Sequence, residues 1–309
     1  MQPRQFTVAE AFGLQSQAKV AGFDQPHPNT PPVDGAYLFR RDLLSDVLTW
    51  LTDPEAESLM LVGPTAVGKS SMPEQVAARL NLPFNAVTGR ERLEFPDLIG
   101  QWVMSEQGMT WRDGPLTRAV RNGEIFVLDE FDYIDPGELA GFNGILQGQP
   151  LHIPETDEIV RPAPGFRVIF TGNTAGEGDD SGRYVGTRIQ NMALLDRFQI
   201  IRVDFPSPDE EREIVRGRVP NIPDQYLEPM IQLAGHVRAA FSGQIEGESF
   251  SRTISTRTLI RWARLCHRYR GVTQKGHDPV SYSLDRAMGF GLDPVQREAL
   301  HEVLQRCKG

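Results

Sequence analysis

The stretch that most constrains what this chain can fold into is G63-P-T-A-V-G-K-S70, which matches the pattern G-x-x-x-x-G-K-[ST]. A short apolar run precedes it at 58–62, and a helix-like run follows it at 74–80. Glycines at these spacings let the backbone curl so that successive N–H groups point inward, and the following helix adds the positive end of its dipole. A chance glycine-rich turn is the alternative, but the strand before and the helix after favour a phosphate-binding loop.

This loop predicts a site for ATP and Mg²⁺. We expect Lys69 to reach the β- and γ-phosphates and the Ser70 hydroxyl to ligate Mg²⁺. The residues expected to bind the nucleotide are Gly63, Pro64, Thr65, Ala66, Val67, Gly68, Lys69, Ser70 and Ser71. The loop also resembles that of tRNA prenyltransferases, which bind an isoprenoid diphosphate near a basic RNA surface. Because this chain is acidic and its downstream motifs point elsewhere, we favour ATP.

The pattern of apolar residues predicts an α/β fold. The runs expected to be strands are 58–62, 83–87, 124–130, 166–173 and 198–205. Short apolar runs separated by helical segments predict a parallel sheet with helices on both faces. After Pro206 the pattern becomes helical. The helices expected there are 208–219, 224–241, 255–270, 280–289 and 293–306.

The same reading divides the chain into three parts. Residues 1–35, rich in Pro, Gln and Gly, are expected to form an extended arm. Residues 36–206 form the predicted α/β nucleotide-binding core, and residues 207–309 a smaller all-α lid domain. Within the core, residues 101–116 read as a hairpin insert with its turn at Gln107-Gly108.

Composition excludes some classes of protein. The 309 residues carry a net charge of −9, which disfavours a nucleic-acid partner because coating a duplex requires a basic face. No apolar run approaches the roughly 18 residues that span a membrane. The N-terminus lacks the pattern of a signal peptide, and Cys266 and Cys307 have no metal-type spacing. We therefore expect a cytoplasmic protein, with Cys266 packed in a helical core.

Polar residues end two of the predicted strands. Asp129 closes the run IFVLD and is expected to hold Mg²⁺ directly or through water, with Glu130 as the general base that polarises the attacking water. Asn173 ends VIFTGN and is expected to orient that water near the γ-phosphate. The alternatives are a solvated strand end for the carboxylates and a turn cap for the amide.

Together these residues resemble an AAA+ ATPase of the MoxR branch. The subgroup that matches best is the CobS-type ATPase subunit of aerobic cobaltochelatase, with the CbbQ-type Rubisco activators as relatives. The stretches that carry the resemblance are PVDGAYLF (32–39), EQVAARLNLP (74–83), DLIG (97–100), WRDG (111–114), VLDEFD (127–132), RPAPGFRVIFTGNT (161–174) and GEGDDSGRYVGTRIQNMALLDRF (176–198). Two positions depart from the family pattern: Ala66-Val67 stands where a glycine is usual, and Phe198 where Trp is common.

The resemblance implies further site residues. Arg197 matches the arginine that a neighbouring subunit supplies to the γ-phosphate, and Arg183 and Arg188 are rivals for that role. A buried Asp196–Arg197 ion pair is the structural alternative. Arg257, in S255-T-R-T, is expected to reach the same phosphate from the lid domain of its own chain, the alternative being a surface arginine at a helix start.

The resemblance also implies a function and partners. We expect a homo-oligomeric ring, a hexamer, that hydrolyses ATP to remodel a protein client. A cobaltochelatase-like complex would add a von Willebrand-A-domain subunit and a large chelatase-like subunit. The predicted hairpin at 101–116 would present Trp102, Met104, Met109 and Trp111 to a client or anchor on the body. The alternatives are a Rubisco-activase-like protein, a nucleic-acid motor, a ring that binds ATP without hydrolysis, and a monomeric small-molecule kinase.

Overall fold

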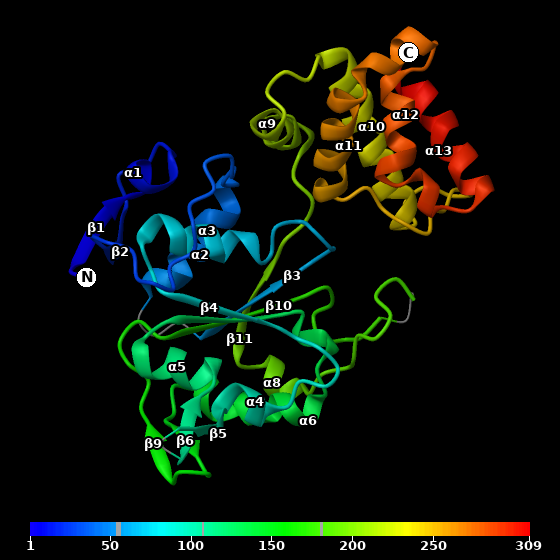
Figure 1. Cartoon of the computed structure of the whole chain (residues 1–309). Coiled ribbons are helices and arrows are strands. Elements are labelled where there is room, and N and C mark those ends of the chain that lie inside the picture. Colours follow the sequence, from blue (N-terminus) through cyan, green and yellow to red (C-terminus); the bar gives the residue numbers. More distant parts are fainter. Residues whose placement is uncertain (54–56, 107, 180–181) are drawn as a thin grey trace. The chain divides into compact units, whose positions relative to one another are not determined.

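The computed structural model describes residues 1–53, 57–106, 108–179 and 182–309 (Figure 1). Gln107, predicted at the hairpin turn, lies outside the described residues. The chain divides into two compact units, which are described separately. Unit 1 contains Met1–Asp34, Arg41–Pro64 and Gly68–Val203, and unit 2 contains Gly35–Arg40, Thr65–Val67 and Asp204–Gly309.

Unit 1 is built on a parallel sheet, which in the described part of the chain has five strands in the order β11-β3-β10-β7-β4. The strands are β3 (Ser58–Val62), β4 (Phe84–Thr88), β7 (Ile125–Asp129), β10 (Arg167–Gly172) and β11 (Phe198–Arg202). Every neighbouring pair is parallel. The α/β fold class predicted from the sequence is therefore confirmed, and the carboxyl ends of β3, β10 and β7 lie side by side at one edge.

Burial explains why these runs become strands. All five residues of β3 and the first four of β7 are buried, as expected for parallel strands that are covered on both faces. Figure 1 shows α2 and α3 on one face of the sheet, with α4, α5, α6 and α8 on the other. These helices are α2 (Arg41–Thr52), α3 (Ser71–Leu80), α4 (Phe95–Ile99), α5 (Pro115–Asn122), α6 (Pro136–Leu139) and α8 (Met192–Leu195). Shorter turns η1 (Phe131–Tyr133), η2 (Ala140–Phe142) and α7 (Asn143–Leu146) complete this side.

The N-terminal segment differs from the extended arm predicted for residues 1–35. Strands β1 (Pro3–Thr7) and β2 (Lys19–Phe23) pair antiparallel, with α1 (Val8–Phe12) between them. This hairpin packs closely on α3, because a side chain at Gly22 would meet the carbonyl oxygen of Leu80 at 2.3 Å. The proline-bearing part, residues 24–40, lacks helix and strand, as predicted for an extended segment. The prediction missed the apolar alternation at Phe6 and Val20, both buried.

Two further hairpins lie outside the main sheet. In the first, β5 (Gly100–Ser105) and β6 (Gly108–Asp113) pair antiparallel, and the rings of Trp102 and Trp111 stack edge to face at 5.7 Å. Trp111 packs against the core, whereas Met104 and Met109 are 79% and 62% exposed. The second hairpin, β8 (Leu151–Ile153) with β9 (Glu158–Val160), was not predicted from the sequence.

Unit 2 is helical. Its helices are α9 (Pro208–Arg218), α10 (Asp224–Phe241), α11 (Thr256–Arg268), α12 (Pro279–Ala287) and α13 (Pro294–Cys307), with turns η3 (Arg270–Lys275) and η4 (Gly289–Gly291). The side chain of Trp262 is fully buried and its indole N–H donates to the carbonyl of Val280 at 2.9 Å. Buried Glu211 accepts two hydrogen bonds from Arg238, at 2.7 and 2.9 Å. No helix in the described part of the chain is long and apolar enough to cross a membrane.

Replacing Phe170 by Ala should strongly destabilise unit 1. Its fully buried ring lies 5.1 Å from that of Phe142 and 4.8 Å from that of Phe198, so truncation leaves a cavity in the middle of the sheet. We expect a loss of about 3–5 kcal/mol in the free energy of unfolding, measured by denaturant titration. Ile159→Ala, at a side chain that is 64% exposed, is the control and should change it by less than about 0.5 kcal/mol. Equal losses of unfolding free energy in the two variants would contradict the central packing of Phe170.

The two thiols should react at very different rates. Burial raises the pKa of Cys266 to about 11, and its side chain is 1% exposed. Burial also raises the pKa of Cys307, but that residue is only half-buried. Because the thiolate is the nucleophile, a disulfide reagent at pH 8 should modify one thiol per folded chain, with the second following only on unfolding. Cys307→Ser should remove the first phase, and rapid labelling of that variant would contradict the placement of Cys266.

Candidate functional site

The predicted phosphate loop connects β3 to α3, and its backbone is curled by positive φ angles. These are 150° at Gly63, 61° at Ala66 and 102° at Gly68. At Gly63 a glycine is required, because a Cβ would lie 2.0 Å from the carbonyl oxygen of Val203. Ala66 adopts the left-handed region without being glycine, which strains the backbone by roughly 1 kcal/mol. The loop thus has the geometry that the sequence pattern predicted.

Lys69 is folded inward. Its side chain is 8% exposed, and its ammonium donates to the carbonyl oxygens of Gly63 and Pro64, each at 2.8 Å. It also donates to Oδ1 of Asn173 at 3.1 Å. These partners are neutral oxygens, and a phosphate oxygen is a stronger acceptor for an ammonium group. The loop therefore presents a buried cation and joins it to the residue that follows β10.

Two oxygen donors suited to Mg²⁺ lie in contact beside the loop. The hydroxyl of Ser70 donates to Oδ1 of Asp129 at 2.7 Å, and the hydroxyl of Thr171 donates to the same oxygen. Mg²⁺ prefers hard oxygen ligands and commonly takes only one or two from the protein, the rest coming from phosphates and water. The predicted pair Ser70 and Asp129 therefore fits this ion. In the described residues no cluster of three or more His, Cys, Asp and Glu forms a further metal site.

Glu130 follows β7 in an unusual backbone conformation. Its φ of 58° and ψ of 43° lie in the left-handed region, which non-glycine residues seldom adopt. Tight contacts hold it there: its N–H faces the Thr171 hydroxyl at 3.4 Å, and a side chain at Gly89 would meet its carbonyl oxygen at 2.4 Å. Glu130 itself is exposed. A strained, exposed carboxylate directly after Asp129, the predicted Mg²⁺ ligand, suits the predicted role of general base.

Asn173 is held from several sides. Oδ2 of the buried Asp132 accepts hydrogen bonds from the backbone N–H groups of Asn173 and Thr174, at 2.8 and 2.9 Å. The hydroxyl of Tyr133 hydrogen-bonds the Asn173 side chain. Burial raises the pKa of Asp132, although these hydrogen bonds act in the opposite direction. The side chain of Asn173, joined to Lys69, is therefore fixed in position rather than free to rotate as a surface cap would be.

Sequence reasoning missed two residues of this site. Thr171 is the direct register partner of Asp129 across β10 and β7, and its hydroxyl joins that carboxylate to the N–H of Glu130. Asp132, three residues after Asp129, anchors the segment that follows β10. The stretches VLDEFD and IFTGN contain both, but only strand pairing reveals that they meet.

The arginines predicted to act on the phosphate of a neighbouring subunit differ in their partners. Arg188 pairs with Asp135 at 3.0 Å and with Glu91 at 3.2 Å. Arg197 donates to the carbonyl of Ala193, and its Nε is buried without a hydrogen-bond partner among the described residues. Within the described part of the chain Arg197 forms no ion pair with Asp196, so that structural alternative is wrong.

Arg197 also lies far from the phosphate loop of its own chain. It precedes Phe198, which pairs with Ser58 at the amino end of β3, whereas the loop begins beyond the carboxyl end of that strand. Arg257 is the exposed second residue of α11 and belongs to unit 2. The structure thus brings together Lys69, Ser70, Asp129, Glu130 and Asn173, while the roles of Arg197 and Arg257 stay predictions.

Known proteins match both parts of the chain. Residues 58–198 match the AAA domain (dynein-related subfamily), and residues 211–307 match the CbbQ/NirQ/NorQ C-terminal domain. Aerobic cobaltochelatase subunit CobS of Sinorhizobium sp is 31% identical over 84% of this chain and 80% of its own length. Protein NorQ of Paracoccus denitrificans is 31% identical over 68% of this chain and 73% of its own.

A solved structure supports the fold. A mutant of RuvB from Thermotoga maritima superposes with a TM-score of 0.50 at 14% identity, covering 82% of this chain and 71% of that one. The strand order, the curled loop and these matches define a P-loop AAA+ core followed by a helical domain. The chain belongs to the MoxR-type AAA+ ATPases, the group that contains CobS, NirQ and NorQ. The resemblance identified from the sequence is thereby confirmed.

Thr171→Val should weaken the metal site while leaving the fold intact. The substitution removes the hydroxyl that orients Asp129, and loss of such a supporting contact costs about 10–100-fold in metal affinity. Titration of Mg²⁺ against nucleotide binding should show this shift. Thr117→Val is the matched control: Thr117 is also fully buried, but its hydroxyl donates to the carbonyl of Ile99 at 2.7 Å. A similar Mg²⁺ shift in both variants would contradict the role of Thr171.

Proposed function

We propose that this protein is a ring-forming, Mg²⁺-dependent ATP hydrolase that remodels a partner protein. The observation that carries the proposal is the meeting of Lys69, Ser70, Asp129 and Asn173 at one edge of the sheet. A scaffold that only bound ATP would need the lysine and the metal ligands. It would have no use for a strained glutamate beside the metal site or for an amide held by three separate contacts.

Each residue has a distinct part in the proposed hydrolysis. The loop and Lys69 hold the phosphates, and Ser70 and Asp129 hold the Mg²⁺ that neutralises their charge. Glu130 takes the proton from the attacking water. Asn173, fixed by Asp132 and bonded to Lys69, orients that water at the γ-phosphate.

The position of Arg197 supports a site shared between subunits. The five residues of β3 separate the level of Arg197 from the start of the phosphate loop by roughly 16 Å at 3.2–3.4 Å per residue. That is farther than an arginine side chain extends, so an Arg197 that acts on the γ-phosphate comes from another chain. Arg188 is the weaker rival, because Asp135 and Glu91 already pair with it.

Exposed apolar residues precede Arg197 in the chain. Val185, Ile189 and Met192 are 82%, 73% and 82% exposed. Large apolar side chains gathered on one segment of a surface mark a contact with another protein. We propose that this segment packs against a neighbouring copy and carries Arg197 to its site, in a ring expected to be a hexamer. Arg257 would act on the phosphate of its own chain.

The client is proposed from the relatives and from one hairpin. CobS is named a subunit of aerobic cobaltochelatase, and NirQ is named a denitrification regulatory protein. By analogy we propose a protein client here, with a von Willebrand-A-domain subunit and a large chelatase-like subunit as candidates. The exposed Trp102, Met104 and Met109 of the β5–β6 hairpin offer an apolar contact for it.

Mixing two inactive variants tests the shared site. Lys69→Ala should lose nucleotide binding, and Arg197→Ala should lose about 10³–10⁵ in turnover. In a random 1:1 ring with head-to-tail interfaces, about a quarter of the sites combine an intact loop with an intact neighbouring arginine. Phosphate release should therefore recover on mixing. No recovery from folded, co-assembling variants would place Arg197 outside catalysis.

Glu130→Gln should separate binding from hydrolysis. The amide keeps the size of the side chain but cannot accept a proton, so ATP should bind with nearly unchanged affinity while turnover falls at least about 100-fold. Equilibrium binding and phosphate release measured on the same preparation give both quantities. Glu138→Gln, at a carboxylate that accepts the N–H of Phe95 at 2.7 Å, is the control and should retain wild-type turnover.

A further inference from the structure

Positive charge is concentrated in one part of this acidic chain. Residues 1–203 carry 17 Lys and Arg against 27 Asp and Glu, whereas residues 204–309 carry 15 against 14. Between Glu248 and Asp278, 29 residues contain seven Lys and Arg and no acidic residue at all. This stretch includes all of α11 and all of η3. The sequence therefore places a continuous stretch of positive charge in the helical unit.

Outside this stretch, six Lys and Arg of the helical unit form ion pairs, whereas among the described residues none within the stretch pairs with a carboxylate. The ion pairs elsewhere in the unit are Arg212–Glu228, Arg216–Asp224, Arg238–Glu211, Arg297–Asp285, Arg306–Glu248 and Lys308–Asp278. Among the described residues, Arg264, Arg268 and Arg270 form no ion pair with any carboxylate. The contrast shows that α11 directs unpaired guanidinium groups to solvent although acidic residues are plentiful in the unit.

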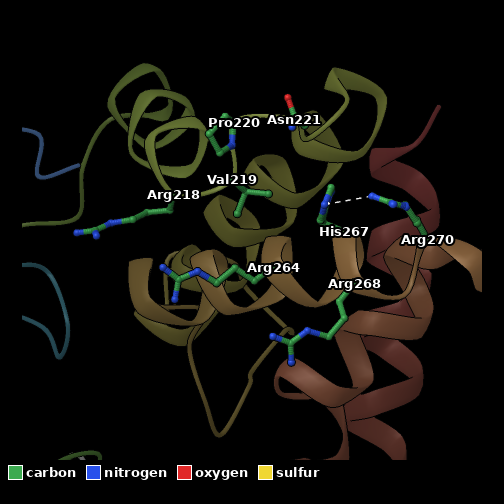
Figure 2. Close-up of a pocket in the computed structure, with 8 residues that line it drawn as sticks. All are labelled: Arg218, Val219, Pro220, Asn221, Arg264, His267, Arg268 and Arg270. Carbon is green, nitrogen blue, oxygen red and sulfur yellow. Dashed lines mark hydrogen bonds between the residues drawn. The ribbon is translucent and has the colours of Figure 1, made fainter. Parts of the chain in front are cut away.

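Arg264, Arg268 and Arg270 line one cavity of about 530 Å³ together with Arg218, where the end of α9 meets the end of α11 (Figure 2). We call this cavity the basic groove. Among the described residues no acidic side chain lines it. Cations in the last turn of α11 also complement the helix dipole, which accounts for Arg268. That effect does not account for Arg218 on α9 or Arg270 on η3.

One arginine of the groove is held by a neighbouring imidazole. The guanidinium group of Arg270 lies 3.2 Å from Nε2 of His267, and because a guanidinium group cannot accept a hydrogen bond, Arg270 is the donor. Val219 and Pro220 add apolar surface to the same wall.

The directions of the side chains indicate what the groove fits. In Figure 2 the guanidinium groups do not converge on one point: Arg218 extends away from α9, Arg268 leaves α11 in another direction, and Arg270 turns toward His267. One phosphate group would engage only part of such a set. Several negative charges spaced along a chain, with apolar atoms between them for Val219 and Pro220, match the arrangement better.

The surroundings favour carboxylates over nucleic acid. In the described part of the chain no aromatic ring lines the groove to stack on a base, and stacking supplies much of the affinity for single strands. The strong excess of Asp and Glu in residues 1–203 would also repel a long polyanion. A short acidic segment can occupy the groove alone, where arginines bind carboxylates with two parallel hydrogen bonds.

We propose that the basic groove is the docking site for an extended Asp- and Glu-rich segment of a partner protein. Its carboxylates pair with Arg218, Arg264, Arg268 and Arg270, and its apolar atoms pack on Val219 and Pro220. The inference rests on the proposed function in that the partner is taken to be a client or adaptor of the ATPase. The groove lies in unit 2, apart from the phosphate loop in sequence, so docking can be measured without hydrolysis.

The test is binding of a fluorescein-labelled peptide of alternating Glu and Gly to the full-length protein, followed by fluorescence anisotropy. We expect saturable binding that weakens as salt increases. Arg264→Glu combined with Arg268→Glu should weaken it at least 10-fold. Arg252→Glu combined with Lys275→Glu makes the same change in net charge outside the groove and should alter it less than two-fold. Arg264→Gln with Arg268→Gln serves as a second, milder groove variant.

Several results would overturn the proposal. They are absence of peptide binding, equal weakening by the groove and control variants, and displacement of the peptide by tripolyphosphate or single-stranded DNA at lower concentrations than by unlabelled peptide. Basal phosphate release is measured in parallel on every variant. If the protein hydrolyses ATP but does not bind the peptide, the docking proposal is wrong and the proposed function stands. If it binds the peptide but does not hydrolyse ATP, the proposed function is wrong and the docking proposal stands.

Discussion

The parallel pairing of β10 between β3 and β7 is the constraint on which the rest of this site depends. It sets the end of β10 beside the phosphate loop on one side and beside Asp129 on the other. A single hydroxyl, that of Thr171, then joins the carboxylate of Asp129, the proposed Mg²⁺ ligand, to the backbone of Glu130. Three stretches that are far apart in the sequence become one site because three neighbouring strands end at the same edge of the sheet.

Some of this was predictable because the signals are local. The curl of residues 63–70 follows from glycine spacing, and the buried runs of β3 and β7 are apolar throughout. Asp129, Glu130 and Asn173 were found because they follow such runs directly. The family resemblance rests on the same local stretches, which is why the comparisons with known proteins agree with it.

Other features depend on tertiary contacts that no local pattern records. Thr171 and Asp132 became visible only through strand pairing and burial. The prolines at 26–32 predict an extended arm, but the first part of that segment has a weak strand pattern and pairs as a hairpin. The basic groove is assembled from α9, α11 and η3, and each contributes only one or two ordinary surface arginines.

Asp132 has a consequence beyond holding Asn173 in place. Its side chain anchors the segment that follows β10, while its own carbonyl oxygen accepts the N–H of Arg188 at 2.8 Å. The segment that continues from Arg188 through the exposed Met192 leads directly to Arg197. Asp132 thus holds both Asn173, beside the phosphate loop, and the start of the segment that runs from Arg188 to Arg197. Within a single subunit, a change at the nucleotide site that moves Asp132 would therefore also move the segment proposed to contact a neighbouring copy.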